Sequence, residues 1–158
     1  MSEQLSPAPS RPHVPDYGIP DGAEGMLPWS HVTARMEQAR NYWVVTATPD
    51  GQPHAVPVWG VWVDGALYFG GGNVRWARNL AANPKMAVHL EDGNDVVTME
   101  GDAEPLTDAA DPVASKLDAA YQAKYQMGFG VPCWRLRPRA VYAWTSFPTD
   151  ATRWVFAG

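Results

Sequence analysis

The sequence predicts an α+β domain, mainly β, in which six strands form a barrel-like sheet with helices beside it. Stretches rich in β-branched and aromatic residues alternate with short turn signals, of which Pro49-Asp50-Gly51 and Asp64-Gly65 are the clearest. Helical spacing of apolar residues separates some of these stretches. The 158 residues, 46% of them hydrophobic, suit one domain with its own core. Strands joined by hairpin turns, with helices between them, favour a barrel-like architecture.

The chain begins with a proline-rich segment over residues 1–27, which we interpret as a flexible N-terminal arm ahead of a domain over 28–158. Such an arm is either a disordered tail or a strap laid over a partner subunit. A helix is expected from Trp29 to about Arg40, with Ser30 as its N-cap.

Six strands and two further helices are expected after this point. The second strand contains Pro57, which predicts a sheet edge or a bulge there. Asn73 is the expected N-cap of a helix over 74–82, and Thr107 or Asp108 that of a later amphipathic helix. Gly101 is a candidate bulge. The expected strands are 42–48, 54–63, 66–69, 85–91, 95–103 and 134–144, and a short apolar segment, 153–156, ends the chain.

Composition excludes several classes of function. The net charge of −5 argues against nucleic-acid binding, because neutralising phosphates needs a basic face. The lone cysteine, Cys133, leaves no disulfide within the chain and no cysteine zinc site, and it is expected to be buried and inert. No apolar run approaches the roughly 20 residues that span a bilayer, and the N-terminus lacks a signal-peptide pattern. We therefore expect a cytoplasmic protein with no membrane partner.

The segment most suggestive of a binding site runs from Tyr68 to Leu80. Three glycines expose the backbone, and a helix follows with Arg75 and Arg78 in its first turns. A helix N-terminus offers unpaired N–H groups and a partial positive charge, which suits a phosphate. The alternative interpretation is a glycine loop with two solvated arginines.

The sequence shows no catalytic residue of its own. The four histidines are scattered, without metal-ligand spacing, so no metal site is expected. Glu91, Asp92, Asp95 and Glu100 flank a turn and are interpreted as solvated rather than as an acid–base pair. Eight tryptophans suit a core or a dimer interface, or else a planar ligand. A pocket without nucleophile or base is typical of chemistry carried by a cofactor.

Several motifs together resemble the pyridoxamine 5'-phosphate oxidase-like split barrels. Each motif is weak alone, but their order and spacing over roughly residues 29–156 are fairly specific. They are Thr48-Pro49-Asp50-Gly51-Gln52-Pro53-His54, Val56-Pro57-Val58-Trp59, Leu67-Tyr68-Phe69, Arg75-Trp76-Ala77-Arg78-Asn79-Leu80-Ala81-Ala82-Asn83-Pro84, Glu100-Gly101-Asp102-Ala103-Glu104 and Thr152-Arg153-Trp154-Val155-Phe156.

The resemblance implies a six-stranded split β-barrel of the FMN-binding type, a homodimer, and a flavin-type cofactor at the subunit interface. In that superfamily the phosphate lies near an Arg-Lys pair, which reads Arg75-Trp76 here, with Arg78 as a second charge. The ring is typically held along a strand matching Ala55–Trp59. The cofactor-binding residues that the resemblance implies are Val56, Pro57, Val58, Trp59, Arg75, Trp76, Arg78 and Asn79.

Positions at which this sequence departs from the family pattern indicate which branch of the family it resembles more. The pyridoxamine-phosphate oxidases proper place an arginine and a lysine where this chain has Val56 and Val61. The chain is therefore more similar to the branch with deazaflavin (F-420)-dependent reductases. The implied activity is an oxidoreductase that uses F-420 or FMN to pass hydride to a small unsaturated molecule. The alternatives are a non-catalytic flavin, F-420 or haem (tetrapyrrole) binding protein, or a structural dimer in which Trp76 fills the phosphate site.

Overall fold

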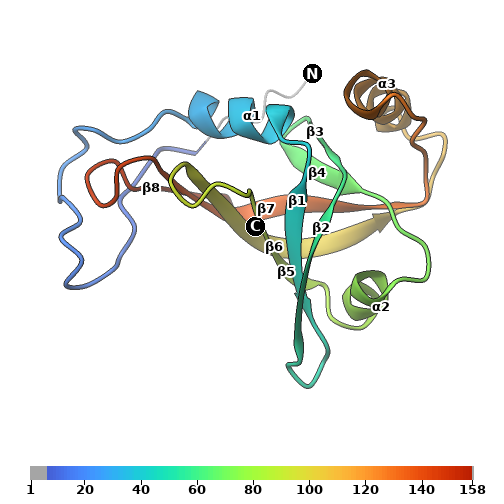
Figure 1. The fold of residues 1–158 in the computed structure, drawn as a ribbon, viewed down its shortest axis with the longest axis horizontal. Coiled ribbons are helices and arrows are strands. Elements are labelled where there is room, and N and C mark those ends of the chain that lie inside the picture. Colours follow the sequence, from blue (N-terminus) through green and yellow to red (C-terminus); the bar gives the residue numbers. More distant parts are fainter. Residues whose placement is uncertain (1–6, 158) are drawn as a thin grey trace.

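The computed structural model describes residues 7–157, which form a strongly curved antiparallel sheet with three helices packed around it (Figure 1). The strands are β1 Tyr42–Ala47, β2 Pro53–Val58, β3 Val61–Val63, β4 Ala66–Phe69, β5 Lys85–His89, β6 Val96–Leu106, β7 Cys133–Trp144 and β8 Thr152–Val155. The helices are α1 Trp29–Gln38, α2 Arg75–Ala82 and α3 Val113–Tyr125. The strand order is β2-β1-β5-β6-β7-β4-β3, and β8 pairs with β7. The predicted mainly β split-barrel class is confirmed.

The sheet curls because two strands that follow each other in the chain lie at its opposite edges. β2 ends at Val58 and β3 begins at Val61, so only Trp59 and Gly60 join the two edges. The connection leaves no room for a side chain, since a Cβ on Gly60 would lie 2.8 Å from the Tyr68 carbonyl oxygen. This corner brings the edges of the sheet together into a split barrel.

The corner also corrects the predicted strand count. The stretch expected as one strand over 54–63 is two strands, and the break falls at the corner rather than at Pro57. Pro57 instead lies within β2 at a sheet edge, as predicted, where its missing N–H costs no ladder bond. The short C-terminal segment is a further strand, β8. The register shift between Glu100 and Gly101 confirms the predicted bulge.

Two apolar clusters stabilise the fold. The larger fills the barrel, and its members on β1 are Tyr42 and Val44. The smaller lies under α3 and consists of Val61, Ala66, Tyr68, Leu106, Leu117 and Cys133. Cys133 is buried as expected, and burial raises the pKa of its thiol to about 11, so the thiolate is disfavoured.

α1 begins at Trp29 as predicted, but α2 and α3 begin later than expected, and none of the three helices has its predicted cap. Pro28 and Val74 occupy the N-cap positions of α1 and α2, where Ser30 and Asn73 were expected, and neither cap residue makes a side-chain cap hydrogen bond. α3 starts at Val113 because Asp108 and Asp111 first turn the chain with their own carboxylates. Side-chain caps compete with local turns, and the sequence alone does not rank the two.

The described part of the predicted N-terminal arm contacts its own chain. Ser10 pairs with Arg153 of β8, and the Arg11 guanidinium donates to the carbonyls of Gly22, Glu24, Thr149 and Ala151 at 2.6–2.9 Å. Residues 1–6 of the arm lie outside the described residues. The division at residue 27, the arm's flexibility and its contact with a partner subunit stay predictions.

Candidate cofactor-binding site

The glycine loop delivers the chain to the N-terminus of α2 without a side-chain cap. The chain leaves β4 at Phe69, passes Gly70–Val74 and enters the helix at Arg75. Val74 at the N-cap position carries no side-chain acceptor, so the first backbone N–H groups of α2 are free of a side-chain partner. The Arg75 side chain is exposed beside them. A partial positive charge and a guanidinium therefore occupy one surface position.

Arg78 stabilises the same loop. Its Nη1 donates to the Asn73 carbonyl oxygen at 2.9 Å and lies 3.3 Å from the Asn73 Oδ1. Asn73, the predicted cap, thus holds Arg78 instead of the helix N-terminus. The arginine remains exposed, one turn from Arg75, so it adds a second positive charge to this surface.

Trp76 points into the core, away from these arginines. It is 6% exposed and packs on Phe69 with ring centroids 5.2 Å apart. A Cβ on Gly71 would lie 2.7 Å from its Cη2 atom. The indole therefore fills the space beneath the glycine loop. It projects from the buried side of α2, whereas Arg75 projects from the exposed side.

Asn79 is also buried and attaches α2 to the sheet. Its Nδ2 donates to the Thr46 hydroxyl at 3.0 Å, and one turn later Asn83 lies 3.4 Å from the Ala47 carbonyl. Both acceptors belong to the end of β1 that forms the hairpin with β2, and Figure 1 shows α2 beside this hairpin. The predicted role of Asn79 in cofactor binding stays a prediction, since its amide already has a protein partner.

The four predicted residues on β2 and the corner extend away from α2. Val56 and Val58 are half-buried against the core, whereas Pro57 and Trp59 are exposed. His54 pairs with Thr46, where α2 attaches, and Val58 pairs with Tyr42 at the far end of the strand. Four residue rises separate them, a span of ~13 Å. The structure thus attaches α2, the helix with the exposed arginines, at one end of the β1–β2 hairpin and places an exposed indole beyond the other end of β2.

A group around the corner was missed by the sequence analysis. The ring of Tyr125 stacks on Trp59, with centroids 4.5 Å apart and planes inclined by 5°. Its hydroxyl accepts the Gly60 N–H at 3.0 Å and lies 2.7 Å from the Arg40 carbonyl oxygen. The sequence identified Tyr125 only as part of the apolar face of its helix, because the corner that it contacts is 65 residues away.

Lys124 completes this group. Its ammonium donates to the Ala39 carbonyl at 2.8 Å, the Tyr42 hydroxyl at 2.8 Å and the Gly60 carbonyl at 3.2 Å. Burial, and then the charge of Arg40, lower its pKa to about 8. All three acceptors are uncharged, so the lysine ties α1, β1 and the corner together without an ion pair.

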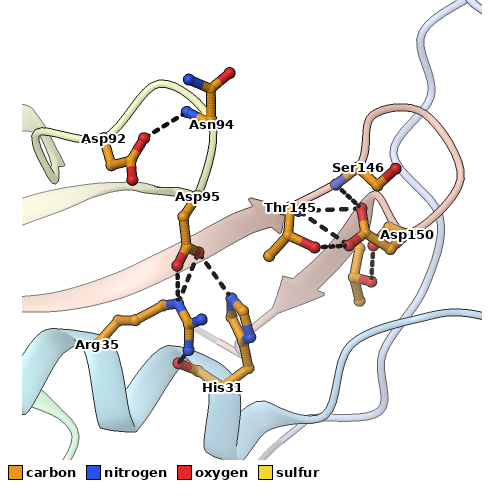
Figure 2. A network of polar contacts seen from close by, with 9 residues as sticks. His31, Arg35, Asp92, Asn94, Asp95, Thr145, Ser146 and Asp150 are labelled. Carbon is orange, nitrogen blue, oxygen red and sulfur yellow. Dashed lines mark hydrogen bonds and ion pairs between the residues drawn. The ribbon is translucent and has the colours of Figure 1, made fainter.

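A separate polar cluster joins α1 to the β5–β6 turn (Figure 2). The Arg35 Nε lies 2.7 Å from both Asp95 oxygens, and His31 Nε2 lies 3.3 Å from one of them. The hydrogen bond from Arg35 lowers the pKa of Asp95, while burial and then Arg35 lower that of His31. Asp92 accepts the Asn94 N–H within the turn. These partners indicate a structural link rather than an acid–base pair.

Residues 7–157 contain neither a metal-binding cluster nor a membrane-spanning helix. Within that range, no group of three or more His, Cys, Asp or Glu residues stands close enough to hold a metal ion. None of the helices in the same range has the length and apolarity needed to cross a bilayer.

Solved structures share this fold at low sequence identity. A FAD-binding protein from Mesorhizobium loti superposes with a TM-score of 0.60 at 21% identity, over 83% of this chain and 96% of the other. An F420 reductase gives 0.53 at 22% identity, over 78% and 98% of the two chains. A heme binding protein from Mycobacterium smegmatis gives 0.59 at 22% identity, over 80% of this chain and 58% of the other.

The sequence itself matches a family profile. None of the curated proteins matches it significantly. The profile described as Pyridoxamine 5'-phosphate oxidase, by contrast, matches residues 29–145, which include the glycine loop, α2, β2 and the corner. The chain therefore belongs to the pyridoxamine 5'-phosphate oxidase family.

Proposed function

We propose that this protein binds a flavin or the deazaflavin F-420 and acts as an oxidoreductase toward a small unsaturated substrate. The observation that carries the proposal is the N-terminus of α2, which has no side-chain cap and lies beside the exposed guanidinium of Arg75. Three features of this position favour one phosphoryl group: N–H donors without a side-chain partner, the helix dipole and an exposed cation. Arg78 adds charge and holds the loop in place.

The ring of the cofactor would extend from this phosphate seat along β2. The strand offers apolar side chains on both faces, Val56 and Val58 toward the core and Pro57 on the outer face, and its ~13 Å span suits a ribityl chain followed by a tricyclic ring. The bound cofactor would supply the hydride chemistry, and the protein would orient the ring and exclude water from it.

Two valines support a cofactor site unlike that of the pyridoxamine-phosphate oxidases proper. Val61 is 1% exposed and Val56 packs against the core, so neither position presents a charge to a phosphate. Phosphate binding would then depend on α2 alone. This favours the F-420-dependent branch, and the fold shared with an F420 reductase and a FAD-binding protein agrees with either cofactor.

We propose a homodimer across the outer face of the sheet. Residues opposite each other in antiparallel strands share a face. The register therefore puts one row of side chains across that face, namely Pro57, Trp43, His89, Thr98, Tyr142 and Arg153. Trp43 stacks on His89, with planes inclined by 3°. A partner on this row would also meet β2, which agrees with a cofactor at the subunit interface. A cytoplasmic location likewise stays a prediction.

A second candidate function is binding without catalysis. One protein of the same fold is a heme binding protein, which favours this candidate. The cargo would then be a flavin, F-420 or a tetrapyrrole.

The absorption spectrum of the purified protein, followed by turnover, separates these functions. Our proposal predicts a flavin or deazaflavin spectrum, with reduced cofactor on the protein reoxidised by a conjugated acceptor faster than in solution. A haem spectrum would support the second candidate. A bound cofactor with no acceleration for a panel of quinones and enones would contradict the oxidoreductase.

A further inference from the structure

A groove lies between the C-terminal ends of α1 and α3. Both helices pack against β3, which runs between them (Figure 1). The groove has a volume of about 660 Å³, within the range of pockets that hold small ligands. We call it the α1–α3 groove, lined by Val61 and Trp62 of β3 and by residues at the ends of the two helices. None of its lining residues belongs to β2, α2 or the glycine loop, so it is separate from the proposed phosphate seat.

Much of the lining of the α1–α3 groove is apolar. Val61 and Trp62 are buried members of the two apolar clusters. Ala120 and Ala123 line the groove from α3, three residues apart and so on the same side of the helix. Their methyl groups leave open the space that larger side chains would fill. A ligand with a hydrocarbon part could therefore bury that part against carbon atoms of the protein.

The charged side chains give the α1–α3 groove one net positive charge. Three of the residues that line it are charged, of which Arg40 and Lys124 are positive and Glu37 is negative. None of the three forms an ion pair among the residues that the structure describes. The groove therefore attracts an anion more than a cation.

Arg40 has the donors that a carboxylate needs. Its Nη1 donates to the Lys124 carbonyl oxygen at 2.8 Å, and its guanidinium lies 5.2 Å from the ring centroid of Tyr125. These contacts hold the guanidinium beside the end of α3. Within residues 7–157, its other N–H groups have no hydrogen-bond partner. A guanidinium with free N–H groups binds a carboxylate through charge-assisted hydrogen bonds.

Lys124 adds positive charge without a free donor. Its ammonium already donates to two backbone carbonyls and to the Tyr42 hydroxyl, and all three acceptors are uncharged. Burial, followed by the charge of Arg40, lowers its pKa to about 8, although Glu37 acts in the opposite direction. The protein thus compensates this ammonium only in part. An anion bound to Arg40 would add to that compensation.

We propose that the α1–α3 groove binds a small amphipathic carboxylate, with its carboxylate on Arg40 and its hydrocarbon part against Trp62 and Ala123. The net charge selects the anion, and the apolar lining favours a ligand with a hydrocarbon part over an inorganic anion. The inference goes beyond the proposed oxidoreductase and does not depend on it, since the two sites share no residue.

The experiment uses the full chain and three probes with matched hydrocarbon chains: octanoate, 1-octanol and octyltrimethylammonium. Arg40→Gln removes the guanidinium, and Ala123→Leu fills the groove. Their matched controls lie outside the groove: Arg137→Gln changes an exposed arginine of β7, and Ala119→Leu an exposed alanine of α3. Dissociation constants come from isothermal titration calorimetry below the micelle concentration of each probe, and circular dichroism checks that each variant folds.

Octanoate should bind at least tenfold more tightly than 1-octanol, and octyltrimethylammonium should bind most weakly. Arg40→Gln should weaken octanoate at least tenfold and change 1-octanol less than twofold, because it removes charge and little apolar surface. Ala123→Leu should weaken both probes, because it removes space. Arg137→Gln and Ala119→Leu should leave octanoate binding within twofold.

Four results would overturn the proposal. Equal affinity for octanoate and 1-octanol would show that the groove does not recognise a carboxylate. Tighter binding of octyltrimethylammonium would show that Glu37 dominates the field. Octanoate affinity within twofold of the unchanged protein in both Arg40→Gln and Ala123→Leu would assign octanoate to another surface. No binding of octanoate at millimolar concentration would show that the groove does not take this class of ligand.

Discussion

The indole of Trp76 lies directly beneath the backbone of Gly71, with Cη2 only 2.7 Å from the position that a Cβ would take. This relationship explains why Arg75 and Trp76, although adjacent in the sequence, have different roles. Arg75 faces solvent, while Trp76 fills the core under the loop that leads to it. Trp76, at the position where the family resemblance implies a lysine, is therefore part of the support of the proposed phosphate seat. In the structure it does not occupy the surface beside Arg75.

Gly71→Ala should destabilise the protein by about 1–3 kcal/mol, because the added methyl group overlaps a buried ring that has little room to move. The measurement is the free energy of unfolding in urea. Gly72→Ala is the control, since nothing lies within 4 Å of its Cβ position. Equal stability of the two variants would show that the loop does not pack on Trp76 in this way.

Asn79 and Thr46 should be energetically coupled. Each single replacement, Asn79→Ala or Thr46→Val, leaves one buried polar group unpaired and should cost about 1–3 kcal/mol. The double variant should cost less than the sum, with a coupling of about 1 kcal/mol in a double-mutant cycle. Strict additivity would mean that this hydrogen bond does not attach α2 to the sheet.

The ion pair of Arg35 and Asp95 should contribute to stability in a pH-dependent way. Because the pKa of Asp95 is lowered in the folded state, the contribution is present above its ordinary value of 3.8 and disappears as the pH falls through the lower folded value. Asp95→Asn should cost about 0.5–1.5 kcal/mol at pH 7, and less near pH 3. Glu91→Gln in the same turn is the control. A cost that stayed constant with pH would contradict the pairing.

Lys124 should give a pH dependence of the same sign at alkaline pH, because its pKa is also lowered in the folded state. Its pKa falls from 10.5 to about 8 on folding, so in that interval the unfolded chain binds more protons and stability rises with pH. Lys124→Met should remove this rise between pH 8 and 10, as measured by urea unfolding at each pH. A parallel pH profile of variant and unchanged protein would show that the ammonium is not buried at the corner.

The sequence predicts the class of fold because its signals are local. Strand runs and the turns at Pro49-Asp50-Gly51 and Asp64-Gly65 depend mainly on neighbouring residues, and the glycine at position 101 marks the bulge although its partner lies on β7. The break at Gly60 was missed because its cause is the Tyr68 carbonyl, which approaches only in the folded sheet. The expected cap at Asn73 failed for a local reason, since its backbone and side-chain oxygens accept from Arg78, five residues further along the chain.

In the candidate site, too, the sequence predicted the local motif but not the contacts between distant segments. The glycine loop and the pair Arg75 and Arg78 were visible as a motif. Whether the residues between and after them face ligand or core was not, because helical spacing does not fix the orientation of α2 toward the sheet. Tyr125 and Lys124 were missed because the residues that they contact lie on segments far away in the sequence.

Titration of the purified protein with FMN and with F-420, comparing Arg75→Ala with the unchanged chain, tests the central claim most directly. The account predicts that the unchanged protein binds at least one of the two cofactors, and that Arg75→Ala weakens this binding at least tenfold while the variant remains folded. Unchanged affinity in Arg75→Ala, or no binding of either cofactor to the unchanged protein, would contradict it.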